Sequence, residues 1–148
     1  MRRLKIDPAV LERFPAYSAA VLYARIALGA AFLSAVAGRF GLWQGTLDWE
    51  YFTKFQHYAA QVNSFLPSSV IPLIASTATV AETALGVLLI LGLWPRWVSL
   101  AAAALLALFG TAMAISFGLK SPMDYSVFSA SGAAGLLALR SSRTLSRT

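Results

Sequence analysis

The sequence predicts an all-α membrane protein, a bundle of four transmembrane helices with an amphipathic outer-surface helix between the first and second spans. Of the 148 residues, 58% are hydrophobic and only 12% are charged, whereas an ordinary soluble domain is about a quarter charged. A soluble chain this short could not bury so much apolar surface, because small domains bury a limited fraction of their chain. We therefore expect a single membrane domain over residues 1–148.

Four apolar stretches predict the spans. Each approaches or exceeds the roughly 20 residues that cross the hydrocarbon at about 1.5 Å per residue. The first is too long for the apolar region of a cleavable signal peptide, so we expect it to remain in the mature protein. The last is the shortest and is rich in Ser, Gly and Ala. The predicted spans are residues 17–38, 70–93, 97–119 and 123–139.

The basic residues outside the spans predict that both termini lie in the cytoplasm. Positively charged residues gather on the cytoplasmic side of membrane proteins. With the N-terminus inside, the outer segments carry only Arg39, Lys54 and Lys120. The inner segments then carry eight: Arg2, Arg3, Lys5, Arg13, Arg96, Arg140, Arg143 and Arg147. This distribution favours contacts with anionic lipid over binding to nucleic acid.

The segment between the first two spans contains a helical pattern of its own. Apolar residues recur there at three- and four-residue spacing, which is typical of an amphipathic helix. Thr46 or Asp48 can cap its start and Pro67 can end it. We expect a helix over about 47–66 that lies across the outer end of the bundle. Its stripe consists of Phe52, Phe55, Ala59, Val62 and Leu66.

Two charged residues inside the predicted spans are the main candidates for function. At about 1.5 Å per residue, Arg25 and Glu82 lie roughly 12 and 16 Å from the cytoplasmic side, so the two can meet. An unpaired charge at such depth is unfavourable by several kcal/mol. One interpretation is a structural ion pair that fixes helix register. The other is a ligand-binding or proton-titratable carboxylate that faces a cavity, near the polar side chain of Thr79.

Further polar residues lie at the outer end of the predicted spans. Asp124 and Tyr125 stand where the third span turns into the fourth, and there Asp124 can cap the helix, pair with Arg39 or Lys120, or bind a ligand. The predicted ligand-binding set is therefore Arg25, Thr79, Glu82, Asp124 and Tyr125. His57 on the surface helix is interpreted as a solvated or capping residue.

The composition argues against several kinds of chemistry. Cysteine is absent and there is one histidine, so thiolate chemistry and a multi-histidine metal or haem site are excluded within one chain. The sequence has no glycine-rich phosphate loop and no nucleophile elbow. We therefore predict neither catalytic residues nor a metal site, and favour a non-catalytic subunit over an independent enzyme.

Three segments resemble the DoxX family of small bacterial membrane proteins. They are Tyr-Ala-Arg-Ile-Ala-Leu-Gly-Ala from Tyr23, Ala-Glu-Thr-Ala-Leu-Gly-Val-Leu-Leu-Ile-Leu-Gly-Leu from Ala81, and Lys-Ser-Pro-Met-Asp-Tyr-Ser-Val-Phe from Lys120. The resemblance covers about residues 18–139, and Arg25, Glu82 and Asp124 match its polar positions. Because the family is similar to the small membrane subunits of thiosulfate:quinone oxidoreductase, it implies four helices, a redox partner and quinone. The resemblance also implies a place in the bacterial cytoplasmic (inner) membrane.

Three functional hypotheses follow. The first is an accessory membrane subunit of a redox or respiratory assembly, with a partner subunit and a quinone or other lipophilic ligand held between its helices. The second is a proton-coupled transporter of small lipophilic cations, which would use Glu82. The third is a structural assembly protein whose polar residues serve only packing. The sequence predicts contact with membrane lipid in each case and allows an oligomer.

Overall fold

The computed structural model describes residues 15–145, with side-chain environments for residues 17–140. All regular elements in this range are helical, so the all-α fold is confirmed for the described part of the chain. The long helices are α2 (Pro15–Arg39), α4 (Ile71–Leu91), α5 (Pro95–Phe117) and α7 (Val127–Leu145). The shorter ones are α3 (Trp49–Val62), α6 (Lys120–Asp124) and the 3-10 helices η1 (Leu42–Gln44) and η2 (Ser68–Val70).

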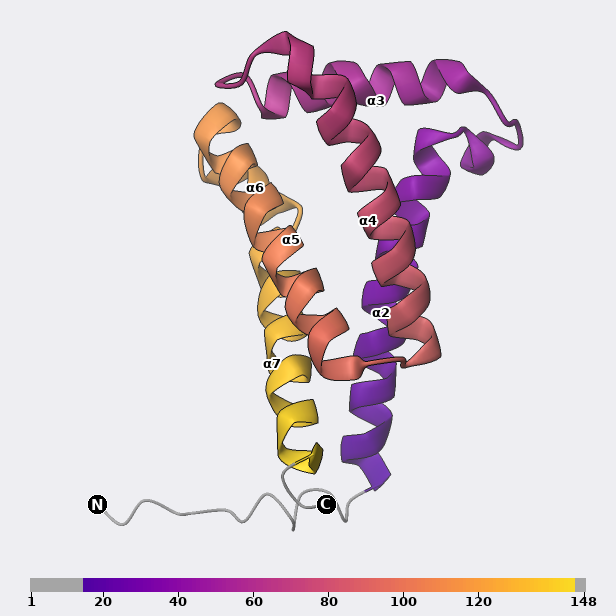
Figure 1. Ribbon diagram of the computed structural model, residues 1–148, viewed down its shortest axis with the longest axis vertical. Coiled ribbons are helices and arrows are strands. Elements are labelled where there is room, and N and C mark those ends of the chain that lie inside the picture. Colours follow the sequence, from indigo (N-terminus) through magenta and orange to yellow (C-terminus); the bar gives the residue numbers. More distant parts are fainter. Residues whose placement is uncertain (1–14, 146–148) are drawn as a thin grey trace.

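The long helices form two pairs that lie side by side. α2 packs chiefly on α4 and α5 chiefly on α7, and α3 lies across one end of the bundle (Figure 1). We call this the α3 end. The opposite, terminal end holds both the start of α2 and the end of α7. Which end faces the cytoplasm stays a prediction. Of the basic residues that support it, Arg2, Arg3, Lys5, Arg13 and Arg147 lie outside the described residues, as does the side chain of Arg143.

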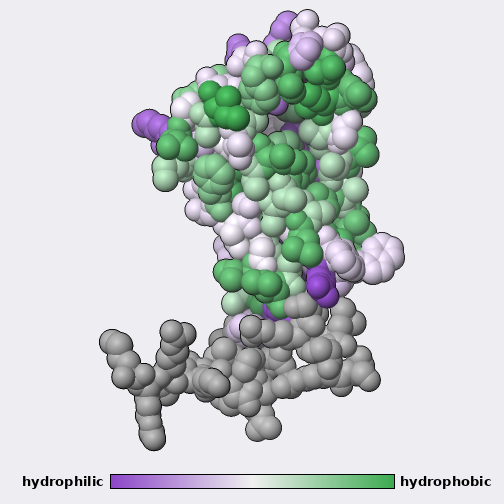
Figure 2. Space-filling model, turned by 60° about the vertical axis from the view of Figure 1, so that its left-hand side comes forward, coloured by the Kyte–Doolittle hydropathy of each residue, from purple (hydrophilic) through white to green (hydrophobic). Residues whose placement is uncertain are grey.

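Three of the described helical stretches are long and apolar enough to cross a membrane: Tyr17–Arg39, Ser68–Leu91 and Pro95–Phe117. Large hydrophobic side chains cover their outward faces, and Figure 2 shows hydrophobic residues predominating on one such face. The predicted fourth span, 123–139, is divided between α6 and α7. Its apolar helix, Val127–Arg140, extends for only about 21 Å at 1.5 Å per residue. A fourth crossing therefore stays a prediction.

A close glycine contact sets the register of α2 against α4. A Cβ atom on Gly29 would lie 2.7 Å from the carbonyl oxygen of Gly86, so neither position has room for a side chain. Small residues allow helices to approach closely where lipid supplies no hydrophobic drive. Because the helices run antiparallel, residues before Gly29 face residues after Gly86, and residues after Gly29 face the first half of α4.

The surface helix α3 forms within the predicted segment and is shorter than expected. The Asp48 side chain caps its start by accepting a hydrogen bond from the Glu50 backbone nitrogen at 2.9 Å, as expected of an N-cap residue. Phe52, Ala59 and Val62 of the predicted stripe are buried. The helix ends at Val62 rather than near Pro67, because Asn63 takes a non-helical conformation and bonds back to the carbonyl of Ala59.

Candidate functional site

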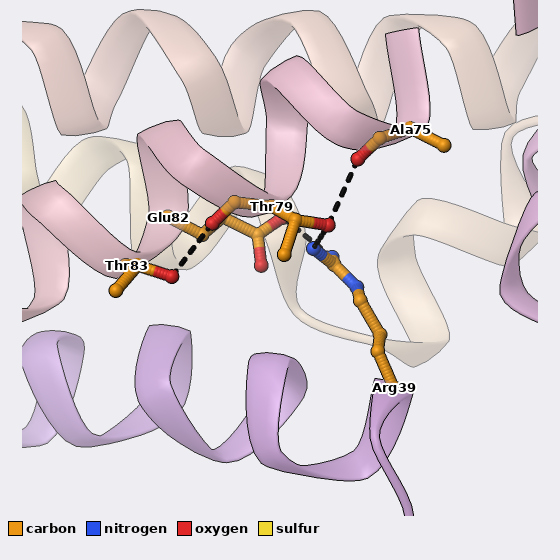
Figure 3. Close-up of polar contacts among 5 residues, drawn as sticks. All are labelled: Arg39, Ala75, Thr79, Glu82 and Thr83. Atoms are coloured by element: carbon orange, nitrogen blue, oxygen red, sulfur yellow. Dashed lines mark hydrogen bonds and ion pairs between the residues drawn. The ribbon is translucent and has the colours of Figure 1, made fainter. Parts of the chain in front are cut away.

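A buried ion pair joins α2 to the middle of α4. Glu82 lies about halfway along α4 and only 2% of its surface is exposed. Nη2 of Arg39 donates a hydrogen bond to Oε1 of Glu82 at 2.7 Å (Figure 3). A buried ion pair is favourable only with good geometry and further hydrogen bonds, because both ions lose their hydration.

Arg39 belongs to α2 and contacts both α3 and α4. It is the last residue of α2, and helical side chains point back toward the helix N-terminus, so its guanidinium reaches into the bundle. There Nη1 donates to Oγ1 of Thr79 at 2.9 Å, and the guanidinium carbon lies 3.8 Å from the ring centroid of Phe55 on α3. This cation–π contact and the two hydrogen bonds leave only 10% of the side chain exposed. Arg39 therefore ties α2, α3 and α4 together.

Two threonines of α4 lie beside the ion pair and donate their hydroxyl protons to backbone carbonyls of the same helix. Oγ1 of Thr79 donates to the carbonyl of Ala75 at 2.8 Å, and Oγ1 of Thr83 donates to the carbonyl of Thr79 at 2.7 Å (Figure 3). Such bonds to the carbonyl four residues earlier satisfy threonine hydroxyls inside helices. Since its proton is already used, the Thr79 hydroxyl meets Arg39 as an acceptor.

The ion pair forms part of the wall of a cavity of about 270 Å³ at the α3 end of the bundle. Its remaining polar lining comes from Tyr58 of α3 and from Asn63, which directly follows that helix. Partial burial raises the pKa of the Tyr58 phenol, so this group stays protonated at neutral pH. The other lining residues are apolar: Leu28, Ala31, Phe32, Ala35, Phe55, Ala59, Val62, Ile74, Ala75, Ala78, Leu106, Phe109, Met113 and Ala130.

One oxygen of the buried carboxylate has no partner. Within the described part of the chain, Oε2 of Glu82 is buried and accepts no hydrogen bond. A buried polar atom left in this state is unfavourable by about 1–3 kcal/mol, and by more when it is charged. Arg39 and Glu82 both line the cavity, so a fixed cation and a carboxylate with one unpaired oxygen stand in an otherwise apolar wall. This combination suits an uncharged, largely apolar ligand with a polar group at one end.

Comparison with known families identifies the chain. A model of the DoxX family matches residues 20–119, which is more than half of the sequence. The chain belongs to the DoxX family. No curated protein and no solved structure matched it. The DoxX match spans nearly all of α2 and the whole of α3, α4 and α5, so it includes Arg39, Thr79 and Glu82, whereas α6 and α7 lie beyond it.

The structure of this DoxX protein brings together two of the predicted site residues, Thr79 and Glu82, but it does not pair Arg25 with Glu82. Arg25 instead donates to the last carbonyls of α4, from Nε to Leu89 at 3.0 Å and from Nη2 to Ile90 at 3.3 Å. The predicted pairing is wrong because the glycine contact places Arg25 opposite the end of α4, about 10 Å along the axis from Glu82. Arg25 caps a helix end.

Asp124 and Tyr125 lie apart from the cavity. Asp124 forms an ion pair with Lys120, one turn earlier on α6, and both side chains are largely exposed. Of the two partners expected for Asp124, the structure therefore shows Lys120 and not Arg39. Tyr125 follows α6 and is 72% exposed. Neither residue is among those that line the cavity, so the predicted ligand set is divided between three places.

Sequence reasoning missed Arg39 as a site residue, because the apolar run ends at Gly38 and the arginine was assigned to the outer loop. The sequence nevertheless contained a signal for Arg39. Helical spacing places it on the same face of α2 as Leu28, Phe32 and Ala35, and all four residues line the cavity. Extending the first span by one residue would have placed an arginine on the inward face of α2.

Proposed function

We propose that this DoxX protein is an accessory membrane subunit of a redox assembly, and that its cavity holds a lipophilic ring of the quinone class. The observation that carries the proposal is the Arg39–Glu82 pair in the wall of an otherwise apolar cavity. Arg39 offers N–H donors to a ring oxygen, while aromatic and aliphatic side chains surround the rest of the ring. Ligand sites commonly combine such apolar walls with a few placed polar groups.

The size of the cavity supports a single substituted ring. A cavity of about 150 Å³ lined by apolar side chains binds benzene in another protein, so 270 Å³ leaves room for ring substituents. Two lining residues of α2, Ala31 and Ala35, are also exposed on the surface of the bundle. An aliphatic tail attached to the ring can leave the cavity past these small side chains and continue into the lipid.

The absence of cysteine, together with a single histidine, supports an accessory role. A chain with these residues has few groups for electron transfer of its own, so a partner would supply the redox centre. The resemblance to small membrane subunits of thiosulfate:quinone oxidoreductase supports the same assignment. The cation-transporter hypothesis is disfavoured, because Arg39 already neutralises the carboxylate that would exchange a proton for a cation.

Mass spectrometry of co-purified small molecules tests the proposal. We would purify the wild type, Glu82→Ala and Asp124→Ala in mild detergent and compare their organic extracts. Asp124 is the matched control, because it is also an acid in an ion pair but lies on the surface. We expect a quinone-type molecule with the wild type and with Asp124→Ala, and its loss from Glu82→Ala.

A second variant separates ligand loss from misfolding. Ala78 is buried and lines the cavity, whereas Ala84 lies on the exposed face of the same helix. Ala78→Leu should displace the ligand while both members of the ion pair are kept, and Ala84→Leu should retain the ligand. The same lipid extract from every variant would contradict the proposal and favour a purely structural role for the ion pair.

A further inference from the structure

The hydrogen bonds around Glu82 show which kind of group its free oxygen lacks. Arg39 reaches the other oxygen, Oε1, and the nearby hydroxyls are committed to backbone carbonyls: Thr79 to Ala75 and Thr83 to Thr79. Within the described residues, Oε2 has no donor. An ionised carboxylate oxygen only accepts hydrogen bonds. The missing partner is therefore a hydrogen-bond donor, which a quinone carbonyl is not.

The charge balance of the site restricts that donor further. Arg39 and Glu82 neutralise each other, and the other lining residues bear no charge at neutral pH. A cationic or anionic ligand would add an unbalanced charge in the apolar interior, which is strongly unfavourable. A neutral hydroxyl satisfies Oε2 without that penalty. Its own oxygen can also accept a bond from the Arg39 guanidinium, which has more donors than its two hydrogen bonds to Thr79 and Glu82 use.

We propose that the ligand donates a hydroxyl proton in a hydrogen bond to Oε2 of Glu82, so that the cavity selects phenol- or hydroquinone-type rings over rings that bear only carbonyl oxygens. This inference rests on the proposed function and specifies the substrate class and oxidation state at that site. The ring would lie among the apolar lining residues, which include Phe32, Phe109 and Met113. A redox assembly in which this subunit takes part would then present the reduced form of its lipophilic carrier here.

Two matched probes test this preference. 4-Propylphenol has a donor hydroxyl, and 1-fluoro-4-propylbenzene replaces that hydroxyl with a smaller group that cannot donate. We would measure the binding of both to the full chain in nanodiscs, with empty nanodiscs as the partition control. We expect the wild type to bind the phenol at least about tenfold more tightly, since a hydrogen bond to a charged group contributes about 1.5–3 kcal/mol.

Glu82→Gln sharpens the test. The glutamine carbonyl can take the place of Oε1 beside Arg39, which turns the amide NH₂ toward the position of Oε2. We expect the preference for the phenol to fall below about threefold. Equal binding of both probes to the wild type, or an undiminished preference in Glu82→Gln, would overturn the inference alone. Failure of both probes to bind, or unchanged binding in Ala78→Leu, would overturn the proposed function and the inference together.

Discussion

The two ends of the bundle use the same kind of residue differently. At the terminal end, Arg25 of α2 is satisfied by backbone carbonyls of α4, beside a closed core that includes Leu89, Val98 and Ala102. At the α3 end, Arg39 of the same helix is satisfied by an acidic side chain, beside a cavity. The bonds of Arg25 go to backbone carbonyls at a helix end, whereas the carboxylate that pairs with Arg39 keeps one unused oxygen. A buried arginine of a membrane helix therefore marks a candidate site where its partner keeps an unused hydrogen-bond acceptor.

The largest expected effect is at the α3 end. Glu82→Ala should lower the free energy of unfolding by about 3–5 kcal/mol, because it leaves Arg39 buried and unpaired. The double variant Arg39→Met and Glu82→Leu should recover most of this loss but retain no ligand. Denaturation in mixed detergent micelles measures the free energy of unfolding of the single and the double variant. A double variant as unstable as the single one would show that the ion pair stabilises the fold in its own right.

The terminal end should respond to a backbone change. Gly92 has a φ of +74° and a Cβ atom there would collide with the Arg25 guanidinium. Gly92→Ala should therefore reduce the free energy of unfolding by about 2–3 kcal/mol. Gly45→Ala is the matched control, because Gly45 has the same left-handed backbone, with a φ of +72°, but open space around it. Gly45→Ala should lower the free energy of unfolding by about 1 kcal/mol. Equal effects would contradict the account of Arg25 as a fixed cap.

A smaller effect is expected where α3 is attached to α5. Oγ of Ser116 donates to the carbonyl of Val62, the last residue of α3, at 2.6 Å. Ser116→Ala should weaken this attachment by about 1 kcal/mol, which amide hydrogen exchange would detect as faster exchange in α3 only. Thr111→Ala serves as the control, since its hydroxyl bonds within its own helix. Faster exchange throughout the bundle would show that α3 does not open separately.

The smallest effect is expected from Asp124→Asn. Exposed ion pairs one helical turn apart contribute about 0.3–0.5 kcal/mol, so this variant should differ little from the wild type in stability. Its binding of 4-propylphenol should be unchanged. A binding loss as large as that of Ala78→Leu would extend the site to α6 and remove the contrast between the buried and the exposed acid.

The sequence alone was sufficient for the all-α membrane class, because apolar length and helical spacing are local properties. It also singled out Glu82 and Thr79, since an acid with polar neighbours is conspicuous in an apolar span. The structure places both in one buried polar cluster, and their role in binding a ligand stays a prediction. It paired Glu82 with the wrong arginine because depth along a helix does not specify the register between helices, which the contact of Gly29 with Gly86 sets. The position and lining of the cavity could not be predicted, because they depend on how two helix pairs and α3 fit together.

Carboxyl NMR of protein labelled with ¹³Cδ-glutamate tests the central claim most directly. The chain contains three glutamates, Glu12, Glu50 and Glu82, so the spectrum is simple and Glu82→Gln assigns the buried signal. On titration with 4-propylphenol in nanodiscs, the account predicts that the Glu82 signal shifts saturably while that of the exposed Glu50 stays in place. A Glu82 signal that does not respond, while the phenol binds, would contradict the assignment of this carboxylate as the ligand's partner.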